Sequence, residues 1–209
     1  MKFNGIKNSC IVLAGILVML TVHTQGQTRI KTEPRQVTLP NGWKLSPVGK
    51  TVRLGDLPLN IAVSPSGKLA AITNNGQSDQ SIQLLNIQRG NIVDSMSIGK
   101  AWLGLVFSDD GTTLYASGGN DNLIIRYSVK KNHLVNQDTL VLGKPWPEKI
   151  SVAGLALDDK SRRLYAVTRE DNSLYVMDTQ NKKVVSQHPL GGEGYTCILS
   201  PDHKFLYAS

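Results

Sequence analysis

The chain has 209 residues, of which 40% are hydrophobic and 19% charged, and its formal net charge is +7. These proportions are typical of a globular protein and exclude an intrinsically disordered chain. The 23 basic residues are scattered along the sequence instead of forming a stripe, so the charge pattern predicts no binding to nucleic acid.

Residues 1–26 have the features of a secretory signal peptide. Lys2 and Lys7 give the segment a positive start, and the stretch 10–22 is almost entirely apolar. Residues 24–26 then offer small side chains to a signal peptidase. Because the apolar run is too short to span a bilayer as a helix, we expect an exported chain, periplasmic or extracellular, with no membrane segment in its mature form. The alternative is an uncleaved membrane anchor.

The next part of the chain is predicted to hold a linker and half of a repeated unit. Residues 27–42 carry no strand pattern, and we expect them to be an N-terminal linker. The segments 43–48 and 50–55 match the third and fourth strands of the repeats that follow. In particular, their ending Leu54-Gly55 returns as Ile98-Gly99, Leu142-Gly143 and Leu190-Gly191.

A segment that occurs four times determines the predicted fold. Each copy has an apolar strand, a polar turn and a second apolar strand, as in Ser200-Pro201-Asp202 followed by Leu206-Tyr207-Ala208. Successive copies are 44, 50 and 42 residues apart when they are aligned on Ser64, Ser108, Asp158 and Ser200. A period of this length, built from short apolar strands, is typical of the blades of a β-propeller.

Each complete copy continues into a third and a fourth strand, which gives a four-stranded meander. In the third copy the strands are predicted at 153–157, 163–167, 173–178 and 183–188. The fourth strand is the most polar, which fits a blade whose first strand lines the axis. A blade cannot bury both faces alone, so residues 70, 114, 164 and 206 are expected to face a neighbouring blade.

The sequence therefore predicts an all-β protein, a β-propeller of four-stranded antiparallel blades that is incomplete in this chain. Residues 43–209 would contain three whole blades and two half-blades, one at each end. The two half-blades could also complete one another, which would close a ring of four blades.

Three elements of the repeat resemble the blade of the YVTN/YncE-type β-propeller family. They are the Ser200-Pro201-Asp202 turn with its following strand, the segment 172–178, and the segment 183–191. The third copy departs from the pattern, because Asp158-Asp159 replaces Ser-Pro. The resemblance implies a propeller scaffold (WD40/YVTN repeat-like) and no particular activity.

A second resemblance concerns exported bacterial proteins in which a YncE-like propeller precedes a phosphoesterase of the alkaline-phosphatase superfamily. It rests on residues 39–43, 57–60, 118–122 and 143–147. It implies that the chain is the N-terminal fragment of such a fusion, whose catalytic domain would lie outside it.

The sequence lacks the common catalytic motifs H-E-x-x-H, C-x-x-C and G-x-S-x-G. His133, His188 and His203 are isolated, so we expect no metal site and no cofactor. Cys197 would be the last cysteine after signal removal, and its apolar strand places it in the core. A metal-dependent sugar-lactone hydrolase is the enzymatic alternative, with contributions from Asn60, Asn74, Asn75, Asn120 and Asp121.

The best binding candidates lie where each fourth strand leads to the next first strand. These connections carry Lys100 and Trp102, Lys144 and Trp146, and Tyr195. In a propeller they surround one mouth of the central channel, where amphipathic aromatic side chains suit the recognition of a protein, a peptide or a glycan. We therefore predict a binding module, with no catalysis in this chain. The alternative is that both tryptophans only pack between blades.

Overall fold

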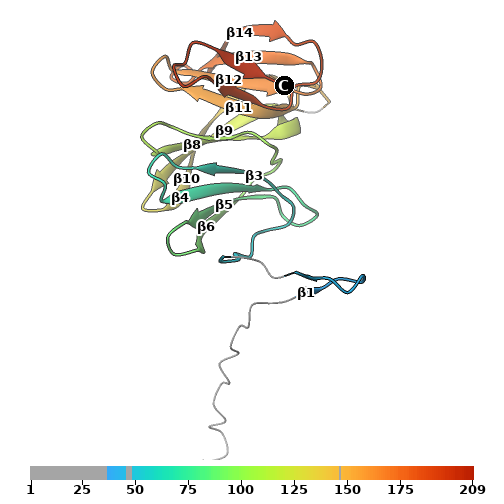
Figure 1. The fold of residues 1–209 in the computed structure, drawn as a ribbon. Coiled ribbons are helices and arrows are strands. Elements are labelled where there is room, and N and C mark those ends of the chain that lie inside the picture. The colour runs from blue at the N-terminus through green and yellow to red at the C-terminus, as the bar shows by residue number, and fades with distance from the viewer. Residues whose placement is uncertain (1–36, 46–48, 146) are drawn as a thin grey trace, which may run out of the picture. The chain divides into compact units, whose positions relative to one another are not determined.

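The structure is a computed structural model that describes residues 37–45, 49–145 and 147–209 (Figure 1). The predicted signal peptide, 1–26, and Trp146 lie outside the described residues. The chain divides into two compact units, residues 1–49 and 50–209. Within the described ranges, no helix is both long enough and apolar enough to cross a membrane.

The described part of the first unit is a short antiparallel hairpin. Strand β1 (Val37–Thr38) pairs with β2 (Lys44–Leu45), and the amide of Leu39 donates to the carbonyl of Trp43 at 2.7 Å. Within the strand predicted at 43–48, Lys44 and Leu45 therefore pair with residues before them, and residues 46–48 lie outside the described residues. The third and fourth strands of a blade depend on the first two, since a two-stranded ribbon is only marginally stable alone.

Residues 50–57 lead into the second unit without forming a strand, which differs from the strand predicted at 50–55. The segment is nevertheless held against the first blade. The amide of Gly55 donates to Oε1 of Gln83 at 3.0 Å, and Oδ2 of Asp56 accepts from the amide of Gln77 at 2.7 Å. The carbonyls of Leu57 and Asp56 also accept the amides of Asn75 and Gly76, both at 3.1 Å, so the segment is held by a side chain of blade A and by the backbone of the loop after β4.

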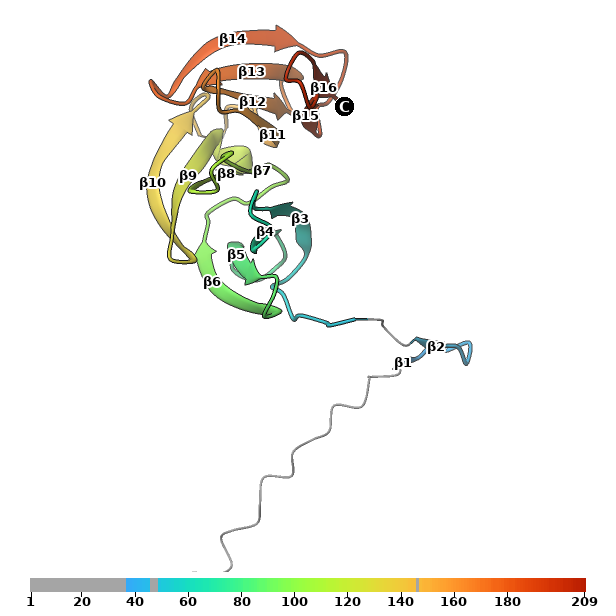
Figure 2. The same cartoon turned by 60° about the vertical axis from the view of Figure 1, so that its left-hand side comes forward.

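The second unit contains three four-stranded antiparallel sheets and a two-stranded sheet, which follow one another in an open arc (Figure 2). Blade A consists of β3 (Pro58–Val63), β4 (Leu69–Asn74), β5 (Ser81–Asn86) and β6 (Asn91–Ser97). Blade B consists of β7 (Leu105–Phe107), β8 (Thr113–Ser117), β9 (Leu123–Lys130) and β10 (His133–Val141). Blade C consists of β11 (Val152–Asp158), β12 (Arg163–Thr168), β13 (Ser173–Asp178) and β14 (Lys183–Pro189). Half-blade D consists of β15 (Cys197–Leu199) and β16 (Leu206–Ala208).

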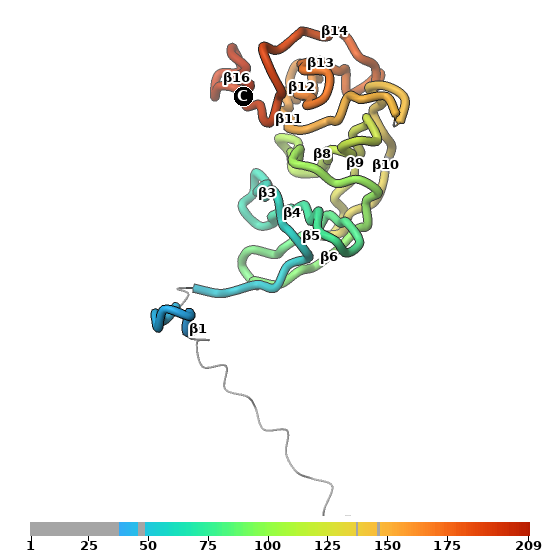
Figure 3. The backbone as a smooth tube through the Cα atoms, turned by 90° about the vertical axis from the view of Figure 1, so that its right-hand side faces the viewer, coloured from blue at the N-terminus to red at the C-terminus, as the bar shows by residue number. Residues whose placement is uncertain are grey.

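This architecture confirms the predicted fold, a propeller of four-stranded antiparallel blades that is incomplete in this chain. Strand order within each blade follows the sequence, and Figure 3 traces the chain from blade to blade, with β16 beside blade C. In blade C burial falls from the inner to the outer strand, as predicted: β11 is buried along almost its whole length, and β14 is mostly exposed. In blade A the first strand, β3, is instead exposed or partly exposed along its whole length.

Apolar side chains between the blades form the core. Leu114 of blade B belongs to the same buried cluster as Leu84 of blade A, and Leu164 of blade C to the same cluster as Tyr115 of blade B. Leu206 of half-blade D packs against the cluster of blade C. The repeated leucine thus faces the preceding blade each time, as predicted, and complete burial of such a side chain stabilises the fold by about 1.5–3 kcal/mol.

The turn from the first to the second strand is held by its own serine. The hydroxyl of this serine accepts the amide of the residue five positions later, at 3.1, 2.9 and 3.0 Å for Ser64, Ser108 and Ser200. Gly67 and Gly111 close their turns with positive φ angles of 66° and 70°, which glycine adopts at little cost.

Blade C replaces the serine with Asp158, and its turn also contacts the neighbouring turns. The hydroxyl of Ser161 holds the pKa of Asp158 below its ordinary value, with a smaller contribution from His203 of half-blade D. Oδ2 of Asp159 accepts the amide of Asp109 in blade B at 2.6 Å. Burial raises the pKa of Asp159, and the nearby acidic side chains raise it further. The turns between the first and second strands therefore link blades B and C and half-blade D to one another.

The third and fourth strands of blade B form a long hairpin. Strands β9 and β10 pair over 123–130 and 133–141, with an irregularity between Asn136 and Asp138. The cause is the turn: Lys131 and Asn132 both have positive φ angles, 51° and 65°. A two-residue turn of this kind matches the twist of the paired strands and extends the hairpin.

Cys197 is buried, as predicted, and is a free cysteine. Its Sγ lies 3.9 Å from the carbonyl oxygen of Tyr165, and burial raises the pKa of the thiol to about 12. The thiol is therefore protonated at neutral pH, which agrees with a side chain that packs in the core and does not act as a nucleophile.

Candidate functional site

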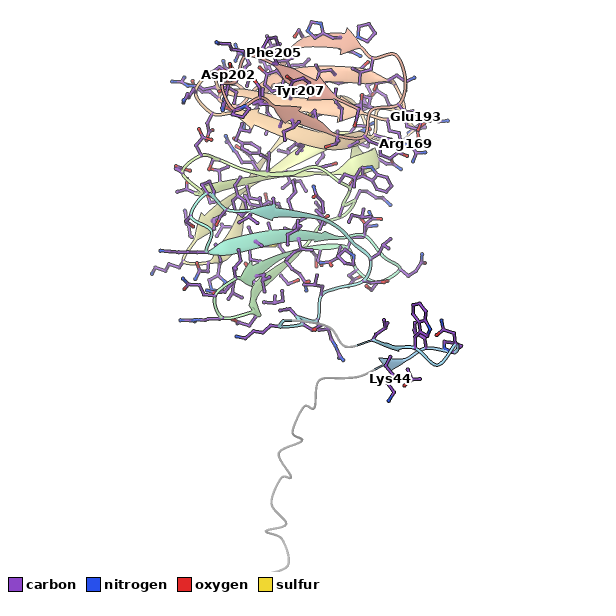
Figure 4. All side chains as sticks on the ribbon, in the orientation of Figure 1. Lys44, Arg169, Glu193, Asp202, Phe205 and Tyr207 are labelled. Carbon is purple, nitrogen blue, oxygen red and sulfur yellow. The ribbon has the colours of Figure 1, made fainter. Side chains whose placement is uncertain are left out.

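A cavity of about 280 Å³ lies at the end of the blades where fourth strands connect to first strands, and we call it the rim cavity. Figure 4 shows Arg169 and Glu193 together on one side of the stacked blades, with Asp202 on the opposite side. Blades A, B and C all contribute to the cavity. The side chains that line it include Asn75, Lys100, Trp102, Asn120, Arg169 and Glu170.

The connection that carries Lys100 and Trp102 is fixed at the residue between them. The amide of Ala101 donates to Oε1 of Gln80 at 2.6 Å, and the carbonyl of Ala101 accepts from Nδ2 of Asn75. Ala101 itself is buried. Both partners come from the loop between β4 and β5, so blade A anchors the backbone from which Lys100 and Trp102 extend.

Trp102 has two roles in the structure. It is partly buried and packs against the cluster that contains Ala153 and Val167 of blade C, and it also lines the rim cavity. One part of the ring therefore fills space between blades, as the packing alternative predicts. The rest of the side chain is available to a ligand in the cavity. Lys100 is exposed, so its ammonium group is also available.

Tyr195 does not line the rim cavity itself, but its ring contacts Arg169, which does. Tyr195 is 44% exposed, and the guanidinium of Arg169 lies 5.7 Å from the centroid of its ring, within the range of a cation–π interaction. Nε of Arg169 donates to Oε2 of Glu193 at 3.0 Å, and this hydrogen bond raises the pKa of Arg169. The aromatic ring and the carboxylate thus hold Arg169 at the edge of the rim cavity.

Lys144 belongs to the next connection and does not line the rim cavity. Its backbone is nevertheless well fixed. The amide of Lys144 donates to Oε2 of Glu148 at 2.5 Å, and its carbonyl accepts from Nδ2 of Asn122 at 2.6 Å. Among the predicted site residues, the structure therefore brings together Lys100 and Trp102, with Tyr195 adjacent, and leaves Lys144 apart.

The side chain of Asn122 makes three hydrogen bonds near the site, and the residue is not among those predicted from the sequence. It is completely buried and has a positive φ of 55°. Besides the bond to Lys144, Nδ2 donates to the carbonyl of Glu148 at 2.7 Å, and Oδ1 accepts from the amide of Ser151 at 2.9 Å. Asparagine tolerates this left-handed conformation better than most residues. Asn122 thus fixes both ends of the connection between blades B and C.

The residues named for the lactone-hydrolase alternative mainly hold connections in place. Nδ2 of Asn60 donates to the carbonyl of Leu103 at 2.6 Å, and Oδ1 of Asn120 accepts from the hydroxyl of Ser151 at 2.7 Å. Asn75 and Asn120 line the rim cavity, whereas Asn60, Asn74 and Asp121 do not. No group of three or more His, Cys, Asp or Glu side chains suited to a metal ion occurs in the part of the chain that the structure describes.

Several solved structures are similar to this chain. A chain of Kuenenia stuttgartiensis hydrazine synthase matches with a TM-score of 0.62 and 16% identity, over 77% of this chain and 44% of that one. A functionally unknown protein from Desulfotomaculum acetoxidans matches with a TM-score of 0.61 and 13% identity, over 73% of this chain and 48% of that one. The β-propeller domain of Cps50 (Swd1) from Myceliophteria thermophila matches with a TM-score of 0.59 and 15% identity, over 72% of this chain and 47% of that one.

These matches support the β-propeller fold, and identities this low show the fold alone. The chain spans less than half the length of each of these three solved chains. No protein-family model and no curated protein matches the sequence.

Proposed function

We propose that this chain is part of a propeller scaffold that binds a protein segment at the rim cavity. The observation that carries the proposal is the convergence of three blades on one cavity lined by Lys100, Trp102 and Arg169. WD40 repeats, such as those of RRP9, are among the similar folds, with a TM-score of 0.57 and 18% identity over 70% of this chain.

The chemistry of the cavity suits a polar peptide segment. Tryptophan and arginine are enriched at the energetic centres of protein interfaces. The lining combines the cations of Lys100 and Arg169 with the carboxylate of Glu170, and the amide of Asn120 adds hydrogen-bonding capacity. A cavity of about 280 Å³ holds only a few side chains, so it would anchor part of a larger contact surface.

The Lys100→Glu substitution is expected to weaken partner binding at least about tenfold, because it reverses a charge at the edge of the contact. A peptide array screened with the purified chain would supply the ligand, and titration of that peptide would give the affinity. Lys183→Glu is the matched control, since it makes the same charge change at an exposed residue of the outer strand β14.

Equal affinities for the wild type and Lys100→Glu would contradict this proposal. A glycan array tested in parallel distinguishes a glycan ligand from a peptide. Trp102→Ala is a poorer test of binding, because part of the ring packs against the core between blades.

Export of the chain and its relation to the YVTN/YncE-type propellers are also proposals. The pattern of residues 1–26 supports export, and the motifs of the third and fourth repeats support the relation. If the segment is a cleaved signal peptide, the protein recovered from the exported fraction of its native cells should begin at Gln27. N-terminal sequencing measures this, and retention of Met1 on the recovered protein would show an uncleaved anchor instead.

A further inference from the structure

Arg169 presents an unused edge of its guanidinium to the rim cavity. Its Nε donates to Oε2 of Glu193 at 3.0 Å, and the group lies 5.7 Å from the centroid of the Tyr195 ring. The two Nη groups have no partner among the residues that the structure describes. A guanidinium that is fixed at Nε offers these two groups as a fork, which matches the two oxygens of a carboxylate.

A second cation and several hydrogen-bond donors belong to the same cavity. The exposed ammonium group of Lys100 has no partner within the described ranges. Oε1 of Gln80 accepts the amide of Ala101 at 2.6 Å, which leaves Nε2 of Gln80 as a donor. Oδ1 of Asn120 accepts the hydroxyl of Ser151 at 2.7 Å, which leaves Nδ2 of Asn120 as a donor. These side chains therefore supply the donors that an anion requires.

The cavity also contains acceptors, namely the carboxylate of Glu170 and Oδ1 of Asn75. Nδ2 of Asn75 donates to the carbonyl of Ala101, so its oxygen remains for a ligand. Of the charged side chains in the lining, two are cations and one is a carboxylate, which leaves the net charge positive. Glu170 opposes the binding of an anion, and its removal is therefore a sensitive probe of the charge of the ligand.

Backbone amides around the cavity are already used. The amide of Ser151 donates to Oδ1 of Asn122 at 2.9 Å, and the amide of Arg169 donates to the carbonyl of Ser151 at 3.0 Å. The amide of Glu170 likewise donates to the carbonyl of Ile150 at 3.1 Å. The C-terminal carboxylate of a peptide is captured by free backbone amides, whereas acidic motifs are recognised by cationic side chains. The arrangement therefore favours the carboxylate of a side chain over that of a chain end.

We propose that the rim cavity receives the carboxylate of an aspartate or glutamate side chain of the partner segment, held by the Nη groups of Arg169 and the ammonium of Lys100. Recognition of this kind rests on the proposed function, and it specifies which side chain anchors the bound segment. All lining residues lie between Asn75 and Glu170, in blades whose four strands are all present, so the site does not depend on where the arc ends.

Peptides that differ at one position test the chemistry of the ligand. The probe is an array of short, C-terminally amidated peptides whose central residue is glutamate, aspartate, glutamine or lysine in otherwise identical sequences. We expect the full chain to bind the acidic peptides at least about tenfold more tightly than the glutamine peptides. Binding without this preference would overturn acidic recognition and leave the proposed function standing, whereas a lack of binding to every peptide would overturn both.

A free chain end is the competing source of a carboxylate. The glutamine peptide is therefore also tested without its C-terminal amide. We expect it to bind as weakly as the amidated glutamine peptide. If it bound as tightly as the amidated glutamate peptide, the chain end would be the group that the cavity holds, and the proposal would be wrong.

Substitutions of two adjacent residues with opposite charge locate the carboxylate. For the tightest glutamate peptide, fluorescence anisotropy should show about tenfold weaker binding to Arg169→Gln and about twofold tighter binding to Glu170→Gln. A gain in affinity cannot result from a misfolded chain. Arg89→Gln is the matched control for Arg169→Gln, since Arg89 is an exposed arginine in the loop between β5 and β6, and this variant should bind like the wild type.

A double-mutant cycle shows whether Arg169 itself holds the carboxylate. On Arg169→Gln, exchange of the central glutamate of the peptide for glutamine should weaken binding no more than about threefold, because the fork is already lost. If this exchange still cost about tenfold on Arg169→Gln, the carboxylate would not lie on Arg169, and the proposal would be overturned. The same holds if Glu170→Gln weakened the binding of the glutamate peptide.

Discussion

The Leu164→Ala variant is expected to lose about 3 kcal/mol of its free energy of unfolding. Leu164 has no exposed surface and lies in the cluster between blades B and C, together with Tyr115 and Met177. Truncation removes buried apolar surface and leaves a cavity, because strands hydrogen-bonded on both sides cannot move in to fill it. Denaturant unfolding, followed by circular dichroism, measures the loss.

Leu206→Ala is the matched control for this variant. Leu206 occupies the equivalent position in half-blade D, but it is only partly buried, and within the described residues its strand β16 pairs with β15 alone. We expect its loss to be less than half of that for Leu164→Ala. Equal losses would contradict the view that each blade is stabilised mainly by the neighbours on both of its faces.

The second large effect is expected for Asn122→Ala, with a loss of about 3 kcal/mol from broken hydrogen bonds and backbone strain together. The substitution leaves the buried amide of Ser151 without its acceptor, and the carbonyls of Lys144 and Glu148 lose their donor. Alanine is also disfavoured at the positive φ of this position, 55°. Thermal and denaturant unfolding measure the total.

Two further variants divide this loss between its causes. Asn122→Gly removes the same hydrogen bonds but accepts the backbone conformation, so it should be more stable than Asn122→Ala by about 1 kcal/mol. Asn120→Ala removes an exposed side chain that makes one bond to Ser151, and its loss should stay below about 1 kcal/mol. If Asn122→Ala were as mild as Asn120→Ala, the connection would be held by other contacts.

The blades could be predicted from the sequence because their signals are local and repeated. The turn that starts at Ser108 and the leucine at 114 recur at Ser200 and Leu206, so strand positions follow from one alignment. The prediction was wrong at the N-terminal half-blade. The strand predicted at 50–55 requires a second strand beside it, and none of the described residues provides one.

The site was predictable only in part, for a similar reason. Lys100 and Trp102 occur in a connection that recurs in register, and alignment of the repeats therefore identifies them. Arg169 and Asn122 lie in loops between second and third strands, whose lengths and sequences differ from blade to blade. Only the stacking of the blades brings these loops to the rim cavity, so no periodic signal marks them.

The position of Trp102 has a consequence for how the protein unfolds. In a simple row of repeats, each module interacts only with its immediate neighbours, and the ends can fray independently. Trp102 belongs to the connection that leads into blade B, and it packs against the cluster that contains Ala153 and Val167 of blade C. The same connection is hydrogen-bonded at Ala101 to Gln80 and Asn75 of blade A, so that loosening of blade C removes support from a segment that also contacts the first blade.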